Sequence, residues 1–210
     1  MARRTFLLLL GMVLALSAAR ATLADDEGFT CLFNGKDLTG WVQPDVPTIF
    51  AVEDGVIVGR TQGDLKHNEF LATEKSYKDF HFKAKVLFKN GNSGIQFRSE
   101  RLPNGAMRGP QADIAAEWWG GLYDEAGKRG VIERYPIADA LKIVKQNDWN
   151  AYEIIAKGNH VVITLNGTKI LDRDDPLFPK EGKLGLQTHV GPPMEVKFKD
   201  ISIKELSPAK

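Results

Sequence analysis

The stretch Phe80-His-Phe-Lys-Ala-Lys-Val-Leu-Phe88 alternates apolar and polar side chains with a period of two. Its even-numbered side chains are all apolar and share one face of an extended strand, whereas His81, Lys83 and Lys85 share the other. Such alternation is typical of a strand in an antiparallel sheet with one face on a core and one face in water. The stretch therefore predicts β-structure around which the rest of the domain packs.

Two hairpins are predicted on either side of this strand. Ile49–Val52 and Val56–Val58 flank a Glu-Asp-Gly turn, and His160–Leu165 and Thr168–Leu171 flank Asn166-Gly. Asn-Gly between two alternating runs is the strongest short-range signal for a type I′ hairpin turn. The two hairpins extend the predicted β-structure well beyond the central strand.

Near the C-terminus, Met194–Phe198 alternates in the same way, and after Asp200 the apolar phase shifts by one residue. A β-bulge inserts one extra residue of this kind. Short strands at regular spacing, separated by turns, predict an all-β, two-sheet antiparallel sandwich or jelly roll with less than about a tenth helix. The only candidate helical turn is Ile137–Lys145. We expect these side chains in the core: Phe82, Val86, Phe97, Ile154, Leu186 and Phe198.

The first 24 residues have the layout of a secretory signal peptide. Arg3 and Arg4 precede a short apolar run, and Ala19-Arg20-Ala21 is an A-x-A cleavage signal. We expect residues 1–24 to be removed, with a mature N-terminus at Thr22 or Asp25, and residues 25–210 to form one domain in the periplasm or outside the cell. No membrane span is expected after cleavage. The alternatives are an uncleaved anchor and, with less support, a lipoprotein.

The composition excludes several classes of protein. The 28 Lys and Arg residues nearly balance the 27 Asp and Glu residues, which argues against a nucleic-acid partner. One cysteine, Cys31, excludes an intramolecular disulfide framework and any Cys-rich zinc site, and we expect it to be buried. The sequence contains no G-x-G-x-x-G motif and no phosphate-binding loop ending in G-K-S/T.

Three predicted strands carry amide, acid and basic side chains opposite their apolar faces. These polar faces consist of Gln96 and Arg98, of Gln111, Asp113 and Glu117, and of Gln187 and His189. Because residues two apart share a face of a strand, we expect the three sets to converge if the strands share one sheet. Amides and a guanidinium can hold sugar hydroxyls or a carbonyl. The alternative for each set is an ordinary solvated strand face.

Between two of these strands lies Trp118-Trp-Gly-Gly-Leu-Tyr-Asp-Glu125. Aromatic rings offer flat faces to sugars, so Trp118, Trp119 and Tyr123 are candidate substrate contacts. Adjacent strand residues face opposite sides, which predicts that one tryptophan lies in the core and the other at the site. The alternative is that both close one edge of the core.

Five motifs together resemble a known bacterial family, the 3-keto-disaccharide hydrolase domain, over about residues 29–206. The motifs are Leu32–Trp41, Asn92–Arg98, Asp148–Asn150, Gly185–Gln187 and Ile201–Leu206. The family is similar in fold to the concanavalin A-like lectins and glucanases. The resemblance implies a jelly roll and an exported enzyme that acts on 3-keto sugars. The glucanases of this fold carry Glu-x-Asp-x-Glu, whereas this chain has Gln111-Ala-Asp113-Ile-Ala-Ala-Glu117, so ordinary glucan hydrolysis is not expected.

A 3-keto glycoside needs only a base for its acidic C2 hydrogen, a donor for the enolate oxygen and a proton for the leaving group. His189 or Asp113 is the candidate base, Arg98 the enolate donor, and Tyr123 or Glu125 the acid. Gln96, Gln111 and Gln187 would hold hydroxyls. We also expect Arg98 to favour the ionised form of Asp113.

The expected partner is a carbohydrate, and no cofactor is expected. A divalent metal is the alternative Lewis acid to Arg98, although no strong ligand set supports it. The competing class is a lectin-like carbohydrate-binding module that uses the same face without chemistry. A structural domain of an envelope complex is a third possibility, for which the sequence offers no specific feature.

Overall fold

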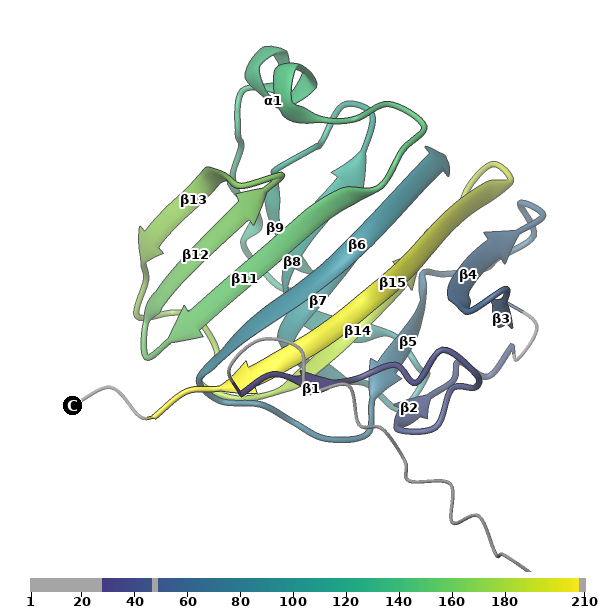
Figure 1. Cartoon of the computed structure of the whole chain (residues 1–210), viewed down its shortest axis with the longest axis horizontal. Coiled ribbons are helices and arrows are strands. Elements are labelled where there is room, and N and C mark those ends of the chain that lie inside the picture. The colour runs from purple at the N-terminus through teal and green to yellow at the C-terminus, as the bar shows by residue number, and fades with distance from the viewer. Residues whose placement is uncertain (1–27, 47–48, 208–210) are drawn as a thin grey trace, which may run out of the picture.

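The computed structural model describes residues 28–46 and 49–207, which form two antiparallel sheets with one core between them (Figure 1). The predicted signal peptide lies outside the described residues. The first sheet has the order β13 (Thr168–Asp174), β12 (His160–Leu165), β11 (Asn150–Lys157), β6 (Phe80–Asn90), β15 (Met194–Glu205), β4 (Val56–Thr61) and β3 (Phe50–Glu53), with β1 (Thr30–Cys31) paired to β15. The second has the order β10 (Gly130–Glu133), β9 (Leu122–Glu125), β8 (Met107–Ala115), β7 (Asn92–Arg101), β14 (Lys183–Thr188), β5 (Glu69–Thr73) and β2 (Trp41–Val42). The predicted two-sheet antiparallel sandwich is confirmed.

The core lies between the inner faces of the two sheets. The central strand β6 pairs with β11 on one side and β15 on the other, and all six side chains predicted to be in the core have an exposed fraction of 0%. Burying an aliphatic or aromatic side chain of this size stabilises a fold by about 1.5–3 kcal/mol. The alternation along β6 thus determines which face of the first sheet packs on the core.

The Asn-Gly turn, the bulge in the last strand and the short helix lie where the sequence predicts them, whereas the predicted burial of Cys31 is not observed. Asn166 has a φ of 50°, as a type I′ turn requires, and the pairing of β15 shifts register between Lys199 and Ser202. The predicted helical segment forms α1 (Ile137–Ile143). Cys31, in contrast, is exposed, so its predicted burial is wrong: it lies on the two-residue strand β1, which pairs with β15 only at Ser202 and Ile203, beyond the part of β15 that β4 covers. Within the described part of the chain, no helix has the length and apolar character needed to cross a membrane.

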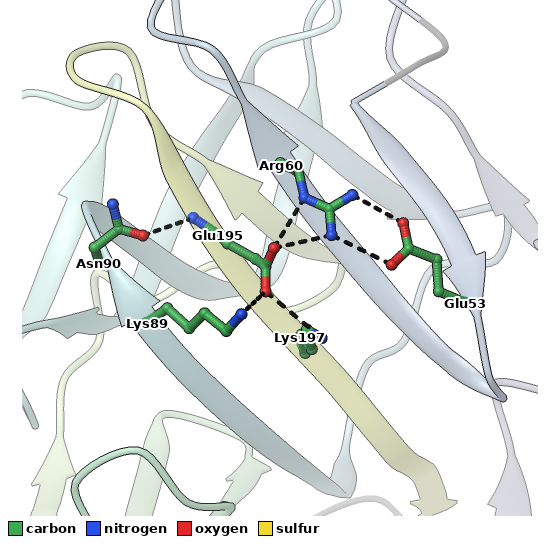
Figure 2. Close-up of polar contacts among 6 residues, drawn as sticks. All are labelled: Glu53, Arg60, Lys89, Asn90, Glu195 and Lys197. Carbon is green, nitrogen blue, oxygen red and sulfur yellow. Dashed lines mark hydrogen bonds and ion pairs between the residues drawn. The ribbon is translucent and has the colours of Figure 1, made fainter.

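The outer face of the first sheet carries a closed network of charges (Figure 2). Arg60 contacts Glu53 and Glu195, each at 2.8 Å, and Lys89 Nζ lies 2.7 Å from Glu195 Oε1. Hydrogen bonds from Lys89 and Arg60 lower the pKa of Glu195 to about 2. These charges are paired with one another, and exposed ion pairs of this kind each contribute at most about 1 kcal/mol to stability.

Candidate functional site

The functional side chains come from the outer face of the second sheet, which is the face turned away from the core. Ala112 and Ile114 of β8 lie in the core, so Gln111 and Asp113 point to the opposite side. Gln96 of β7 lies directly across from Gln111 in the register of the two strands. The period-two argument therefore places these three polar residues together, as predicted.

A chain of hydrogen bonds joins the amides to one carboxyl group. Gln96 Nε2 donates to Gln111 Oε1 at 3.2 Å, and Gln111 Nε2 donates to Asp113 Oδ1 at 2.9 Å and to Gln187 Oε1 at 3.3 Å. Gln111 lies over Gly94, where an added Cβ would come within 2.4 Å of the Gln111 amide carbon. The absence of a side chain at Gly94 thus gives Gln111 its position.

Above this network lies a pocket of about 310 Å³. It is lined by residues from β7, β8, β9 and the loops beside them: Asn68, Asn92, Gln111, Asp113, Trp118, Tyr123, Glu125, Ala126 and His189. Six of these were predicted as site residues from the sequence. The pocket holds two carboxyl groups, an imidazole, a phenol and several amides within one small volume, which is the inventory that acid–base chemistry on a polyhydroxylated ligand needs.

Burial raises the pKa of Asp113 to about 7, and the nearby charge of Glu125 acts in the same direction. The hydrogen bond from Gln111 and the charge of Arg134 act in the opposite direction and are outweighed. The expectation that Arg98 would favour ionised Asp113 is therefore wrong, because Arg98 is not among the groups that affect this carboxyl. Asp113 Oδ2 lies beside Gly121, 3.2 Å from where a Cβ would stand.

The second carboxyl group, Glu125, is held by a loop residue. Asn68 Nδ2 donates to Glu125 Oε1 at 2.9 Å, and the Val190 N–H donates to Asn68 Oδ1 at 2.9 Å. Val190 follows His189, which lies just beyond the end of β14. Asn68 thus connects the end of β9 with the loop that carries the only histidine of the pocket among the described residues.

The two adjacent tryptophans divide as predicted. Trp119 is 3% exposed and stacks on Tyr152 in the core, with ring centres 6.3 Å apart. Trp118 lines the pocket, and the guanidinium carbon of Arg134 lies 3.7 Å from the centre of its ring. Tyr152 also donates its hydroxyl to the backbone oxygen of Asp113 at 2.8 Å, so the core directly supports the site. The assignment of Trp119 as a substrate contact is corrected.

Arg98 does not reach the pocket, which corrects its assignment as the enolate donor. The pairing of β7 with β8 shifts register between Gln96 and Glu100, and Arg98 has a φ of 47°. This bulge breaks the period-two alternation, so Arg98 no longer shares the face of Gln96. Its side chain is 1% exposed and donates to Asp79 and to three backbone oxygens, those of Lys78, Gly158 and Pro179.

Glu117 also lies outside the pocket. Strand β8 ends at Ala115, and the Trp118 N–H donates to the Ala115 oxygen in a turn. Glu117 would share a face with Asp113 only if the strand continued to residue 117, but the strand ends two residues before it. Glu117 is exposed and borders a separate recess near Arg134.

Gln96 and Gln187 belong to the site as supports rather than as lining residues, since both are 0% exposed. Near Gln96, Met107 at the start of β8 packs with Phe70 and Ala72 of β5 and lies against Gly185 of β14. Both buried amides act on the pocket through their hydrogen bonds with Gln111.

Three lining residues were missed, Asn68, Asn92 and Ala126, and the sequence carried a signal for the first two. Asn92 precedes Gln96 by four residues on β7, so the same period of two places it on the outer face. Asn68 immediately precedes β5 and stands two residues before Phe70, so continuing the alternation of the strand places it on the same side as Phe70. In the described part of the chain, no group of three His, Cys, Asp or Glu side chains is arranged to bind a metal ion.

Replacing Gly94 by alanine should displace Gln111 from the sheet, because the added methyl group would come within 2.4–2.6 Å of its amide atoms. The three hydrogen bonds of Gln111 would be lost together, so affinity for a sugar ligand should fall by tenfold or more, about 1.4 kcal/mol. Calorimetric titration measures the effect. Gln111→Ala is the companion variant: it removes the same three hydrogen bonds without a clash at Gly94 and should weaken binding to a similar extent. Unchanged affinity in Gly94→Ala would show that Gln111 does not shape the pocket.

Comparisons with solved structures support the fold and its relation to carbohydrates. A proposed glycosyl hydrolase from Parabacteroides distasonis is 27% identical, with a TM-score of 0.62 over 86% of this chain and 94% of its own. The carbohydrate binding module CBM66 from Bacillus subtilis is 21% identical, with a TM-score of 0.62 over 80% and 96%. A β-glucanase from Bacillus licheniformis is 11% identical, with a TM-score of 0.58 over 87% and 100%. No curated protein matches the chain.

The two-sheet architecture and its structural neighbours define a jelly roll of the concanavalin A-like class, with a small polar pocket on the outer face of the second sheet. This chain belongs to the 3-keto-alpha-glucoside-1,2-lyase-like domain family, whose model matches residues 28–204. The resemblance stated from the sequence motifs is therefore confirmed.

Proposed function

We propose that the pocket binds the oxidised ring of a 3-keto glycoside and cleaves the glycosidic bond by elimination across C1 and C2. One observation carries the proposal: Asp113, a buried carboxyl whose pKa is raised to about 7, shares a small polar pocket with a second carboxyl group, Glu125. A base is most effective when its pKa lies near the working pH. The family assignment points to the same chemistry.

The ketone at C3 acidifies the hydrogen on C2. Asp113 accepts this proton, and the C–H electron pair forms an enolate across C2 and C3. The enolate then collapses, the C1–C2 double bond forms, and the C1–O bond breaks to release the aglycone oxygen, which takes up a proton. Addition of water across the new double bond completes a net hydrolysis. Gln111 occupies Oδ1 of Asp113, which leaves Oδ2 as the basic atom.

The other lining residues supply the remaining roles. Because Arg98 lies outside the pocket, we assign stabilisation of the enolate oxygen to the Asn92 amide. This side chain lines the pocket and makes no hydrogen bond within the described part of the chain. Neutral amides stabilise oxyanions effectively in enzymes. Glu125 delivers the proton to the leaving oxygen, and His189 is the alternative base. Trp118 offers an apolar surface to the ring.

A carbohydrate-binding module without catalysis is the second candidate. The specific observation in its favour is that three amide side chains, Asn68, Asn92 and Gln111, line the pocket. Amides have both donors and acceptors and hold vicinal hydroxyls without any need for proton transfer.

Incubation with a panel of 3-keto glycosides and their unoxidised parents separates the two candidates. An eliminating enzyme releases the aglycone from the oxidised members alone and, in heavy water, incorporates deuterium at C2 when water adds to the double bond. A binding module shows saturable binding with no product. Equal cleavage of the unoxidised parents would exclude the elimination mechanism, since they lack the acidic C2 hydrogen.

A further inference from the structure

We infer that Asn68 is a positioning residue of this site, which fixes the carboxylate of Glu125 and the loop after His189 relative to each other. The inference rests on the proposed function for the role of Glu125, but its geometry is independent of that role. Asn68 immediately precedes β5. Among the described pocket residues, only its side chain bonds both to another lining residue, Glu125, and to the loop that carries the lining residue His189.

The donor and the acceptor of the Asn68 side-chain amide each form a hydrogen bond, and their partners lie on different segments. The Nδ2 donor meets Glu125 Oε1 at 2.9 Å, and the Oδ1 acceptor meets the Val190 N–H at 2.9 Å. An amide is required for this pairing, because a carboxylate at position 68 has an acceptor for Val190 but no donor for Glu125. Only asparagine has the length of aspartate together with a donor.

The segment that carries Asn68 also packs against the loop after His189 at a second place, away from the pocket. A Cβ at Gly63 would stand 3.0 Å from Pro193 Cδ and 3.1 Å from the Gly191 oxygen, so the 62–68 segment rests on the 189–193 loop. The loop after His189 is also held from the other side, because Asn90 Nδ2 donates to the Pro193 oxygen at 2.7 Å. The loop thus contacts Gly63, Asn90 and Asn68, and of these three residues only Asn68 lines the pocket.

This arrangement sets where Glu125 stands relative to the ligand. The carboxylate has one oxygen fixed by Asn68, which leaves the other to face the pocket. Without the amide donor, Glu125 is free to rotate about its side-chain bonds, and a carboxyl group that transfers a proton must lie within hydrogen-bond reach of its target. Loss of Asn68 therefore acts on the chemical step more than on the binding of the sugar ring.

Two substitutions separate the two ends of the amide. Asn68→Asp keeps the acceptor for Val190 but places a second carboxylate against Glu125. Asn68→Ala removes both contacts. We expect kcat to fall by about 10²-fold in both variants, with KM within threefold of the original protein. Hydrogen exchange of the Val190 amide, followed by NMR, should accelerate in Asn68→Ala alone.

Asn90→Ala is the matched control, because it releases the same loop from outside the pocket; its kcat should stay within twofold of the original protein. Wild-type kcat in Asn68→Asp would overturn the inference, since loop attachment alone would then explain the residue. If the unaltered protein binds 3-keto glycosides without turnover, the proposed function fails. The inference is then judged by the structure of Asn68→Asp: a displaced Glu125 carboxylate supports it, and an unchanged carboxylate position refutes it.

Discussion

Replacing Asp113 by asparagine is expected to lower turnover of a 3-keto glycoside by about 10³-fold and to leave the protein folded. The amide has the same shape and its oxygen can still accept the hydrogen bond from Gln111, but it cannot take a proton from C2. Steady-state kinetics on the best substrate of the panel measures the effect. Glu117→Gln is the matched control: it makes the same chemical change at an exposed position outside the pocket and should leave turnover unaltered.

The raised pKa of Asp113 gives this prediction a pH dependence with a definite sign. Because the base must be ionised, turnover of the unaltered protein should rise with pH through about 7. Stability should move the other way. Between about pH 4 and 7 the carboxyl group is ionised in the unfolded chain but protonated in the folded one, so the free energy of unfolding decreases as pH rises.

Asp113→Asn removes this penalty, and its Tm should therefore exceed that of the unaltered protein at pH 8 and equal it near pH 3. A more stable but inactive variant is the expected signature of a strained catalytic residue. Unchanged turnover would remove Asp113 as the base and direct attention to His189. A lower Tm at pH 8 would show that the carboxylate is stabilised in the fold.

The period of two in the sequence is sufficient to predict most of this molecule, because a strand with one dry face must alternate. It predicts the sandwich, the core side chains of β6, and the convergence of Gln96, Gln111, Asp113 and Gln187. These conclusions depend only on the alternation of side chains along a strand. The same alternation predicts the division of Trp118 and Trp119 between pocket and core, but both residues lie in the turn after β8, so this outcome does not follow from strand geometry.

The failures occur where the strand geometry is interrupted by contacts distant in sequence. At the bulge, the Arg98 guanidinium binds Asp79 and three backbone oxygens from other segments, and no local pattern around residue 98 reveals these partners. Met107 of β8, which lies near Gln96, packs with Phe70 and Ala72 of β5, a contact that the sequence around Gln96 does not indicate. The raised pKa of Asp113 is likewise a property of burial, which the sequence alone does not specify.

Replacing Arg98 by alanine should destabilise the fold by about 3–5 kcal/mol, the usual cost of leaving one partner of a buried ion pair without the other. Arg98 Nη2 lies 2.9 Å from Asp79 Oδ1, and both side chains are almost completely buried, at 0% and 5% exposed. Removing the guanidinium would also leave three backbone oxygens without this donor. Urea unfolding followed by fluorescence measures the loss, and Arg108→Ala, at an exposed arginine on the same hairpin, should change stability by less than about 0.5 kcal/mol.

The same variant distinguishes a structural arginine from a catalytic one. At a temperature well below its lowered Tm, the folded fraction of Arg98→Ala should turn over a 3-keto glycoside at close to the original rate, because the pocket is lined by other residues. Arg98→Lys, which keeps a charge for Asp79 but loses the planar fork that reaches several backbone oxygens, should unfold at an intermediate urea concentration. A normal unfolding free energy in Arg98→Ala combined with a 10²-fold loss of turnover would reverse the assignment and return Arg98 to the chemistry as the donor to the enolate oxygen.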